Sequence, residues 1–295
     1  MKQVFRKSNK WARFFVMLAL FLLYVGPAQA IDLAQIRVYS DTSKSTTDRL
    51  HSLLDLLVEE VRSPVALQEG WGGGQIDHDY IVTQLALAMS YVAKETEVGR
   101  TQLRETLEHT SSPEAKEAVF IALGLAGDAS VSKELTGLLK RPGQPHRRAL
   151  AASALGECGS VLSIPELVEA LGDSSMTQNG LDVGQPSQND YPVRRAASLA
   201  LRHLGVAVKH SDPAKEFDYQ VDLDSAVKVV EPLLHSTDNA SVIDAIQAIK
   251  RMSGSRARET LQGFVKQNEE EASRQDLVIA AKAALTDIAV PGSVP

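Results

Sequence analysis

Cysteine is almost absent from this sequence, since Cys158 is the single one among 295 residues. One cysteine cannot form a disulfide within the chain, and it cannot build a metal site that needs several thiolates. A chain of this length buries a core large enough to fold without such cross-links. We therefore expect Cys158 to be an inert core residue, which is compatible with an oxidising compartment.

Aromatic residues are also rare and amount to 5% of the chain. After position 30 they are Trp71, Phe120, Phe217, Phe264 and five tyrosines. A β-sandwich needs many aromatic and β-branched positions, whereas Ala and Leu dominate this sequence. The composition therefore favours closely packed helices.

Acidic residues are missing from the first 30 positions, which contain five basic ones. An apolar run of 12 residues, Phe14 to Val25, follows the basic start, and Gly26-Pro27 and Ala28-Gln29-Ala30 come after it. This order is typical of a secretory signal peptide with cleavage after Ala30. The run is shorter than the about 20 residues that a membrane-spanning helix needs. We predict an exported bacterial protein, periplasmic or extracellular; the alternative is an uncleaved membrane anchor.

Positive charge is in deficit in the rest of the chain. The whole sequence has a net charge of −6, and loss of the five basic residues of the leader leaves −11. Nucleic acid and anionic lipid repel such a protein at long range. We therefore expect no nucleic-acid partner, and contact with a membrane only if residues 1–30 are retained.

Motifs for chemistry are lacking as well. No two histidines form the His-x-x-x-His pair of a helical zinc site, and no nucleophile elbow or phosphate-binding loop occurs. Asp77-His78-Asp79 is better interpreted as an acidic helix start than as a metal site, because adjacent residues on a helix diverge. We therefore predict no catalytic, cofactor-binding or metal-binding residue, and no enzyme activity.

What the sequence does contain is an internal repeat. Six segments place Ala directly before Leu or Ile near the end of an apolar helical pattern, at intervals of 36, 32, 46, 48 and 36 residues. The short intervals fit a two-helix unit, and the long ones fit the same unit with an insertion. The six anchors are Ala86-Leu87, Ala122-Leu123, Ala154-Leu155, Ala200-Leu201, Ala248-Ile249 and Ala284-Leu285.

Each anchor has a small or slim residue on the same helix face, four positions before its Leu or Ile. Such residues let a neighbouring helix approach closely, as stacked repeats require. Glycines after several anchors, at 127, 159, 205 and 254, predict helix ends in the left-handed conformation, and a second apolar helix follows each of the first five anchors. The small or slim residues are Thr83, Val119, Ala151, Ala197, Ala245 and Ala281.

The stretch 147–159, RRALAASALGECG, followed by IPELVEAL at 164–171, resembles a HEAT-like repeat. It is most like the short bacterial type that is also found in phycobilisome lyases, and VRRAASLAL at 193–201 is similar. The resemblance covers residues 78–290. It implies an all-α fold, a right-handed α-solenoid of about six two-helix repeats, and it is nearly silent on activity.

The flanks of this solenoid need separate interpretations. Residues 31–77 are expected to form an N-terminal cap, with a helix over 45–62, and a Gly-rich linker around Trp71. Residues 291–295 are expected to form a disordered tail. Two insertions, 172–190 and 206–223, interrupt the solenoid and bracket the helix 191–204. Loops on a rigid scaffold often carry function, but a surface loop also lengthens at little cost, so both interpretations stay open.

Six residues are candidates for binding a partner: Arg147, Arg148, Arg194, Arg195, His203 and His210. Arg148 and Arg194 stand at the same place in consecutive repeats, seven positions before the Leu of their anchors. They therefore predict a short basic ladder that holds a carboxylate or phosphate. The alternative is that each arginine pairs with a neighbouring acid and ties the repeats together.

The leading hypothesis is an exported, non-enzymatic scaffold that needs no cofactor and binds another protein or a peptide. A second hypothesis, implied by the resemblance, is a lyase- or isomerase-like activity on a bound tetrapyrrole, for which no catalytic residue can be named. A third is a membrane-tethered adaptor that keeps residues 1–30.

Overall fold

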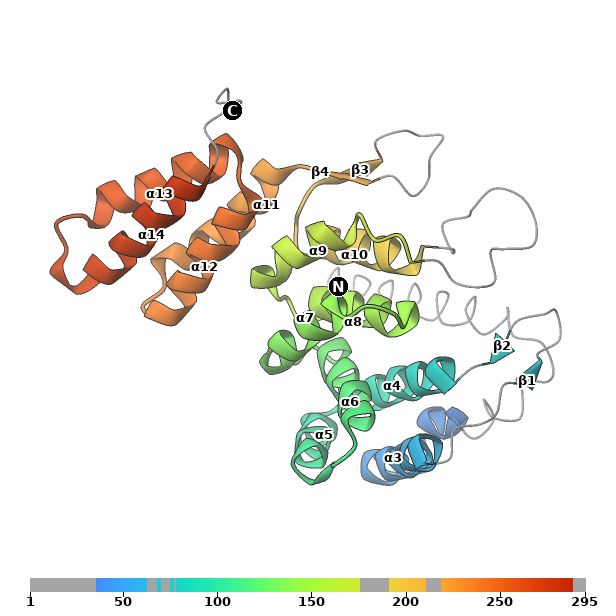
Figure 1. Ribbon diagram of the computed structural model, residues 1–295. Helices are drawn as coiled ribbons and strands as arrows, with labels where there is room; N and C mark the ends of the chain where they lie inside the picture. The colour runs from blue at the N-terminus through green and yellow to red at the C-terminus, as the bar shows by residue number, and fades with distance from the viewer. Residues whose placement is uncertain are drawn as a thin grey trace, which may run out of the picture.

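The computed structural model describes residues 36–62, 68–69, 75–76, 78–175, 191–210 and 219–288. The predicted signal peptide 1–30 with its cleavage after Ala30, the Gly-rich residues 70–74, the predicted tail 291–295, and residues 176–190 and 211–218 of the two insertions lie outside these residues. Within them the chain forms an elongated, curved array of helices that runs from α3 to α14 (Figure 1). Every helix described is too short or too polar to span a bilayer.

The six Ala-Leu or Ala-Ile anchors lie on six helices, which we call the first helices of the repeats. A second helix follows each of the first five, and no second helix follows α14 in the described residues. The first helices are α4 (His78–Glu95), α6 (Pro113–Leu125), α8 (Pro145–Glu157), α10 (Pro192–His203), α12 (Asn239–Met252) and α14 (Gln275–Asp287). The second helices are α5 (Glu97–His109), α7 (Ser132–Lys140), α9 (Ile164–Ala170), α11 (Leu223–Val230) and α13 (Gly254–Asn268).

Shorter elements complete the array. Helix α3 (Thr46–Arg62) lies where the sequence predicts the N-terminal helix and packs on α4. The 3₁₀ helix η7 (Glu231–His235) follows α11 directly, so the α-helix ends where Pro232 would remove a backbone donor. The other 3₁₀ helices are η2 (Arg37–Ser40), η3 (Ala129–Val131), η4 (Val161–Ser163) and η8 (Ala272–Arg274).

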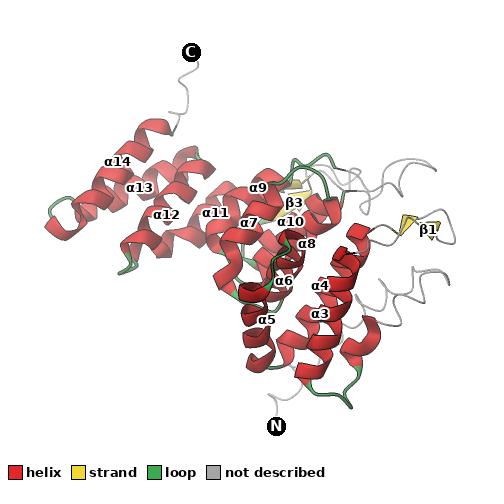
Figure 2. Ribbon diagram, turned by 60° about the horizontal axis from the view of Figure 1, so that its bottom comes forward, coloured by secondary structure: helices red, strands yellow, loops and turns green. Residues whose placement is uncertain are grey.

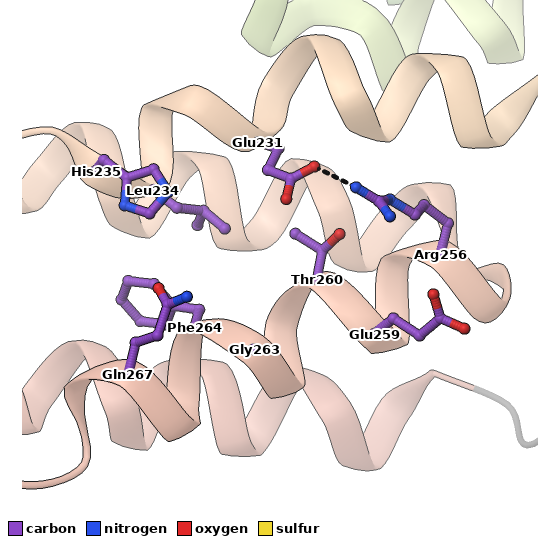
Figure 3. A pocket seen from close by; sticks show the side chains of 9 residues that line it. All are labelled: Glu231, Leu234, His235, Arg256, Glu259, Thr260, Gly263, Phe264 and Gln267. Atoms are coloured by element: carbon purple, nitrogen blue, oxygen red, sulfur yellow. Dashed lines mark hydrogen bonds and ion pairs between the residues drawn. The ribbon is translucent and has the colours of Figure 1, made fainter.

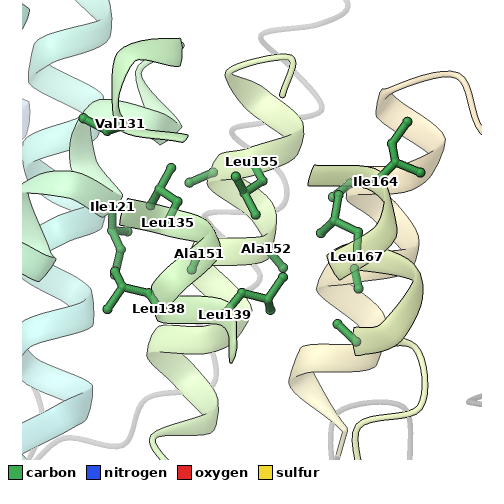
Figure 4. Packing of buried hydrophobic residues seen from close by; sticks show 14 of the residues in the cluster. Ile121, Val131, Leu135, Leu138, Leu139, Ala151, Ala152, Leu155, Ile164 and Leu167 are labelled. Carbon is green, nitrogen blue, oxygen red and sulfur yellow. The ribbon is translucent and has the colours of Figure 1, made fainter. Parts of the chain in front are cut away.

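The core lies between the first and second helices of successive repeats. The six small or slim residues before the anchors are all buried. Leucines of α7 face alanines of α8, and residues of α9 continue the same apolar layer (Figure 4). The first helices approach one another closely, because a Cβ atom added at Gly156 of α8 would lie 2.8 Å from Cα of Ala200 in α10.

Glycine ends three of the first helices as the sequence predicts. Gly127, Gly159 and Gly205 have φ values of 90°, 73° and 89°. At the end of α6, the backbone N–H of Asp128 donates to the carbonyl of Leu123, and that of Gly127 donates to the carbonyl of Gly124. These paired bonds satisfy carbonyl groups that the helix leaves open.

Two short antiparallel strand pairs interrupt the helices, and the sequence analysis did not predict them. Strands β1 (Gln68–Glu69) and β2 (Gln75–Ile76) pair before α4. Strands β3 (Val208–His210) and β4 (Tyr219–Val221) pair within the second insertion, with Val208 opposite Val221 and His210 opposite Tyr219. The two described ends of the second insertion are therefore paired with each other.

The stack of first helices is uneven. Helix α4 packs on α6, α6 on α8 and α8 on α10, whereas α12 meets the preceding repeats mainly through α9 and η4. Both views show α11–α14 leaving the array to one side (Figures 1 and 2). The residue directly after the anchor is small in α4, α6 and α8, where it is Ala88, Gly124 and Gly156, and it is Arg202 in α10.

Candidate functional site

Arg147 is buried at the start of α8, with 3% of its surface exposed. Its guanidinium forms ion pairs with Asp79 of α4 and with Glu114 and Glu117 of α6, the last at 3.4 Å. Burial lowers the pKa of Arg147, but the carboxylates outweigh it, so the net shift is upward and the charge is kept. Arg147 therefore ties three helices together, as in the alternative interpretation of the sequence, and its charged group is occupied within the chain.

His78 extends this cluster to α3. Its Nδ1 lies 2.8 Å from Oε1 of Glu60, and its Nε2 lies 2.9 Å from Oε1 of Glu114. Burial lowers the pKa of His78, but the two carboxylates outweigh it and hold the pKa above its ordinary value. Asp79 pairs with Arg147, and Asp77 lies outside the described residues. The segment Asp77-His78-Asp79 thus contributes two members of an ion-pair cluster, in addition to starting a helix.

Arg148 and Arg194 converge on Asp173, the second residue of the first insertion. Arg148 forms an ion pair with the Asp173 carboxylate and also donates to Oγ of Ser175 at 3.1 Å. Arg194 of α10 donates from Nε to the carbonyl of Asp173, and its guanidinium lies 4.7 Å from the ring centre of Tyr191. Arg148 therefore holds a carboxylate of the chain itself, and Arg194 binds the backbone carbonyl of the same residue.

The remaining candidates lie on the surface around α10. Arg195, His203 and His210 are exposed. The ring of His210 is tilted against that of Tyr219 across the β3–β4 hairpin, with 5.1 Å between ring centres. Unlike Arg147 and Arg148, these three side chains face solvent at a place where the chain leaves and re-enters the helix stack.

A groove with a volume of about 570 Å³ joins the two insertions. Arg194 of α10 and Tyr219 of β4 both line it, so the hairpin returns to the side of α10 where the first insertion starts. The two insertions adjoin α10 at its opposite ends, and residues of both line this groove. The other lining residues are Val168, Leu171, Gly172, Gln220, Val221 and Leu223.

A smaller hollow of about 140 Å³ lies between η7 and α13 (Figure 3). Arg256 and Glu231 form an ion pair of 2.7 Å on one side of it, and His235 lies on the other side. Thr260 and Phe264 of α13 lie between these groups. Because its two main charges neutralise each other, this hollow offers a weaker site for a charged ligand than the groove does.

Cys158 and the acidic groups show no arrangement for catalysis in the part of the chain that the structure describes. Burial raises the pKa of the Cys158 thiol, so it is a poor nucleophile at neutral pH. The residue is half-buried at the end of α8, less enclosed than the sequence analysis expects, and its Sγ lies 3.9 Å from Oγ of Ser132. No group of three His, Cys, Asp or Glu residues within the described ranges is placed to hold a metal ion.

Two sets of contacts were not predicted from the sequence: those of His78 with Glu60 and Glu114, and the ion pair of Arg251 in α12 with Glu166 in α9. These contacts join residues far apart in the chain, and no local pattern in the sequence indicates them.

Comparison with known proteins gives a family for part of the chain. Residues 101–177, from α5 to just beyond α9, match the family of HEAT repeats. Among solved structures, a chain from the complex of CpcE and CpcF of phycocyanin lyase from Nostoc sp. PCC7120 is 16% identical, with 88% of each chain covered and a TM-score of 0.35. No match was found among curated proteins. The sequence match therefore identifies HEAT repeats at residues 101–177, and the described residues on both sides of this stretch form further packed helices.

Proposed function

We propose that this chain is an exported, non-enzymatic scaffold that binds another protein or a peptide. The observation that carries the proposal is the helix array itself, because stacked helix pairs offer a long surface to a partner. Buried ion pairs such as those of Arg147 hold the array together from within. The exposed side chains around α10 and the adjoining groove are the place where we expect the partner to bind.

Export is the first part of the proposal to test. We expect the mature protein to begin at Ile31 and to fractionate with periplasmic or secreted proteins. An Ala30→Trp variant places a large side chain at the cleavage position, so the precursor should accumulate. A mature protein that keeps Met1 and sediments with membranes would contradict cleavage and support the tethered adaptor.

Partner binding is tested by crosslinking mass spectrometry on the full chain in the cell that exports it. We expect crosslinks to one partner to concentrate on residues 191–223. Crosslinks spread evenly over the array at the level of an unrelated exported protein would contradict a specific scaffold.

A titration with a free bilin separates this proposal from the tetrapyrrole hypothesis, and we expect an unchanged absorbance spectrum.

A further inference from the structure

Thr260 of α13 is a buried polar side chain without a partner. It is 8% exposed, and its hydroxyl makes no hydrogen bond to any residue that the structure describes. Several threonines in other helices donate their hydroxyl to a backbone carbonyl three or four residues earlier, and Thr260 does not. A bound group that pairs with this hydroxyl would therefore be stabilised. The threonines that make the bond are Thr83, Thr106, Thr136 and Thr286.

The side chain of Thr260 points from α13 into the hollow that α13 forms with η7 (Figure 3). A second unmatched donor lies beside it, because Nε of Arg256 is also buried and makes no hydrogen bond to the described residues. Arg256 stands four residues before Thr260, so both side chains lie on one face of α13. The hollow of about 140 Å³ is larger than one water molecule needs, so it has room for a group of several atoms.

The charges around the hollow favour a neutral group. The guanidinium of Arg256 pairs with Glu231 at 2.7 Å, and Glu259 adds a second carboxylate to the lining. These two acids repel a carboxylate or a phosphate, and an ammonium group brings only donors to a place where donors lack partners. A peptide group is neutral and carries one acceptor and one donor. Its carbonyl oxygen can accept from Thr260 and Arg256, and its N–H group can donate to Glu259.

The wall of the hollow allows a main chain to come close to α13. Gly263 is part of the lining, and a Cβ atom added there would have no atom within 4 Å. A glycine lets another backbone approach a helix closely. Leu234 and Phe264, which are both buried, add apolar surface to the same hollow. An extended segment with small side chains fits this combination.

We propose that the hollow between η7 and α13 binds a peptide main chain, with Thr260 and Arg256 as donors to one of its carbonyl groups. Threonine has two common rotamers in a helix, so its hydroxyl can turn toward the bound carbonyl. The inference goes beyond the proposed scaffold function, because it adds a second peptide contact on the C-terminal helices, whose lining residues do not include any of α10.

The test is an NMR titration of the full chain with capped trialanine, a neutral peptide whose only polar groups are those of the main chain. We expect the Nε–H signal of Arg256 to shift and to saturate. The matched control is the Nε–H signal of Arg258, which lies on the same helix and also lacks a hydrogen bond to the described residues, but does not line the hollow. Acetate and methylammonium at the same concentration should leave the Arg256 signal in place.

Two variants connect the shift to the hollow. Thr260→Val removes the hydroxyl and keeps the shape, so binding should weaken about three- to tenfold for the loss of one hydrogen bond. Gly263→Leu fills the hollow and should abolish the shift. Gly137→Leu in α7 is its control, because an added Cβ there also has no atom within 4 Å, and it should leave the shift unchanged. Unfolding midpoints check that the variants are folded.

Three results would overturn the inference. One is a larger shift with acetate than with capped trialanine, which would indicate an anion site. Another is a shift that both Thr260→Val and Gly263→Leu leave unchanged while their unfolding midpoints match the wild type. The third is an Arg256 signal that does not move at any concentration of the peptide, which would mean that the hollow holds water only. Each of these results leaves the scaffold proposal standing, because crosslinking around α10 tests that proposal separately.

Discussion

At the scale of single residues, the described ion pairs at the start of α4, α6 and α8 join more carboxylates than permanent cations. Its carboxylates are those of Glu60, Asp79, Glu114 and Glu117, and its permanent cations are those of Arg141 and Arg147. His78 touches a carboxylate with each ring nitrogen, and only the protonated ring donates from both. The cluster therefore favours a charged His78.

This gives a pH dependence with a defined sign. Because the pKa of His78 is raised on folding, the stability it contributes is fully present below its unfolded pKa, about 6.5, and is lost as pH rises through the folded pKa. Glu114 has the opposite pH dependence. Burial raises its pKa, but His78 and Arg147 lower the pKa by more, so the net shift is downward. The stability that Glu114 contributes is therefore lost as pH falls through its folded pKa. Relative to a His78→Gln variant, the unfolding free energy of the wild type should thus fall as pH rises from about 6.5 through the folded pKa of His78. A difference that stays constant across this range would contradict a charged His78.

Arg147 provides a second prediction, about stability. Replacing it with Met leaves Asp79, Glu114 and Glu117 without their buried partner, so the free energy of unfolding should fall by about 3–5 kcal/mol in denaturant titrations. Arg141 is the matched control, because it pairs with Glu117 while 52% exposed. Arg141→Met should cost about 0–1 kcal/mol. Equal losses for the two variants would show that burial does not decide their contributions.

Sequence alone could not assign these arginines. Adjacent residues on a helix point in different directions, so the pattern Arg147-Arg148 does not say which side chain is buried. The partners of Arg147 lie about 30 residues or more away, in Glu114, Glu117 and Asp79, and only the stacking of three helices brings them together. Both arginines were named as candidates from the sequence, with both interpretations of them left open.

At the scale of the elements, the helices of the repeats depend on local signals in the sequence, so they could be predicted. Each anchor combines helix periodicity with a small residue and, in several cases, a glycine stop, and all three signals lie within one stretch of about ten residues. The two strand pairs were missed because each strand has only two or three residues. Such strands show too little alternation to be recognised.

Two glycines in helices test the close approach of α8 and α10. In Gly156→Ala the new Cβ would lie 2.8 Å from Cα of Ala200, so we expect a loss of about 1–3 kcal/mol from overpacking. Gly137 of α7 has no atom within 4 Å of an added Cβ, so Gly137→Ala should gain about 0.5–1 kcal/mol from helix propensity. Thermal unfolding of both variants measures whether each substitution lowers or raises the stability. A gain for both would show that the α8–α10 contact has room to spare.

At the scale of the whole molecule, Arg251 spans the break in the stack. This residue of α12 forms ion pairs with Glu166 and Glu169 of α9, the second at 2.6 Å, and Lys140 also reaches Glu166, at 3.1 Å. The pairing joins α11–α14 to the earlier repeats across 85 residues of sequence. It adds to the packing of α12 against α9 and η4.

Removing this contact should separate the two parts in unfolding. We expect Arg251→Ala to speed hydrogen exchange in α11–α14 while exchange in α4–α8 stays at the wild-type rate, because repeats depend mainly on their neighbours. Arg256→Ala is the control, since Arg256 pairs with Glu231 inside the C-terminal part. Uniformly faster exchange over the entire chain in the Arg251 variant would mean that the array unfolds as one unit.

The uneven stack also has a mechanical consequence. Along α4–α10 each first helix packs on the next through small side chains, so we expect this stretch to resist bending. Past α10 the two parts of the array are joined by the contacts of α12 with α9 and η4 and by the two ion pairs of Arg251. A protein pulled at its two ends should therefore bend first at this junction, and the two parts should keep their own shapes while the angle between them changes.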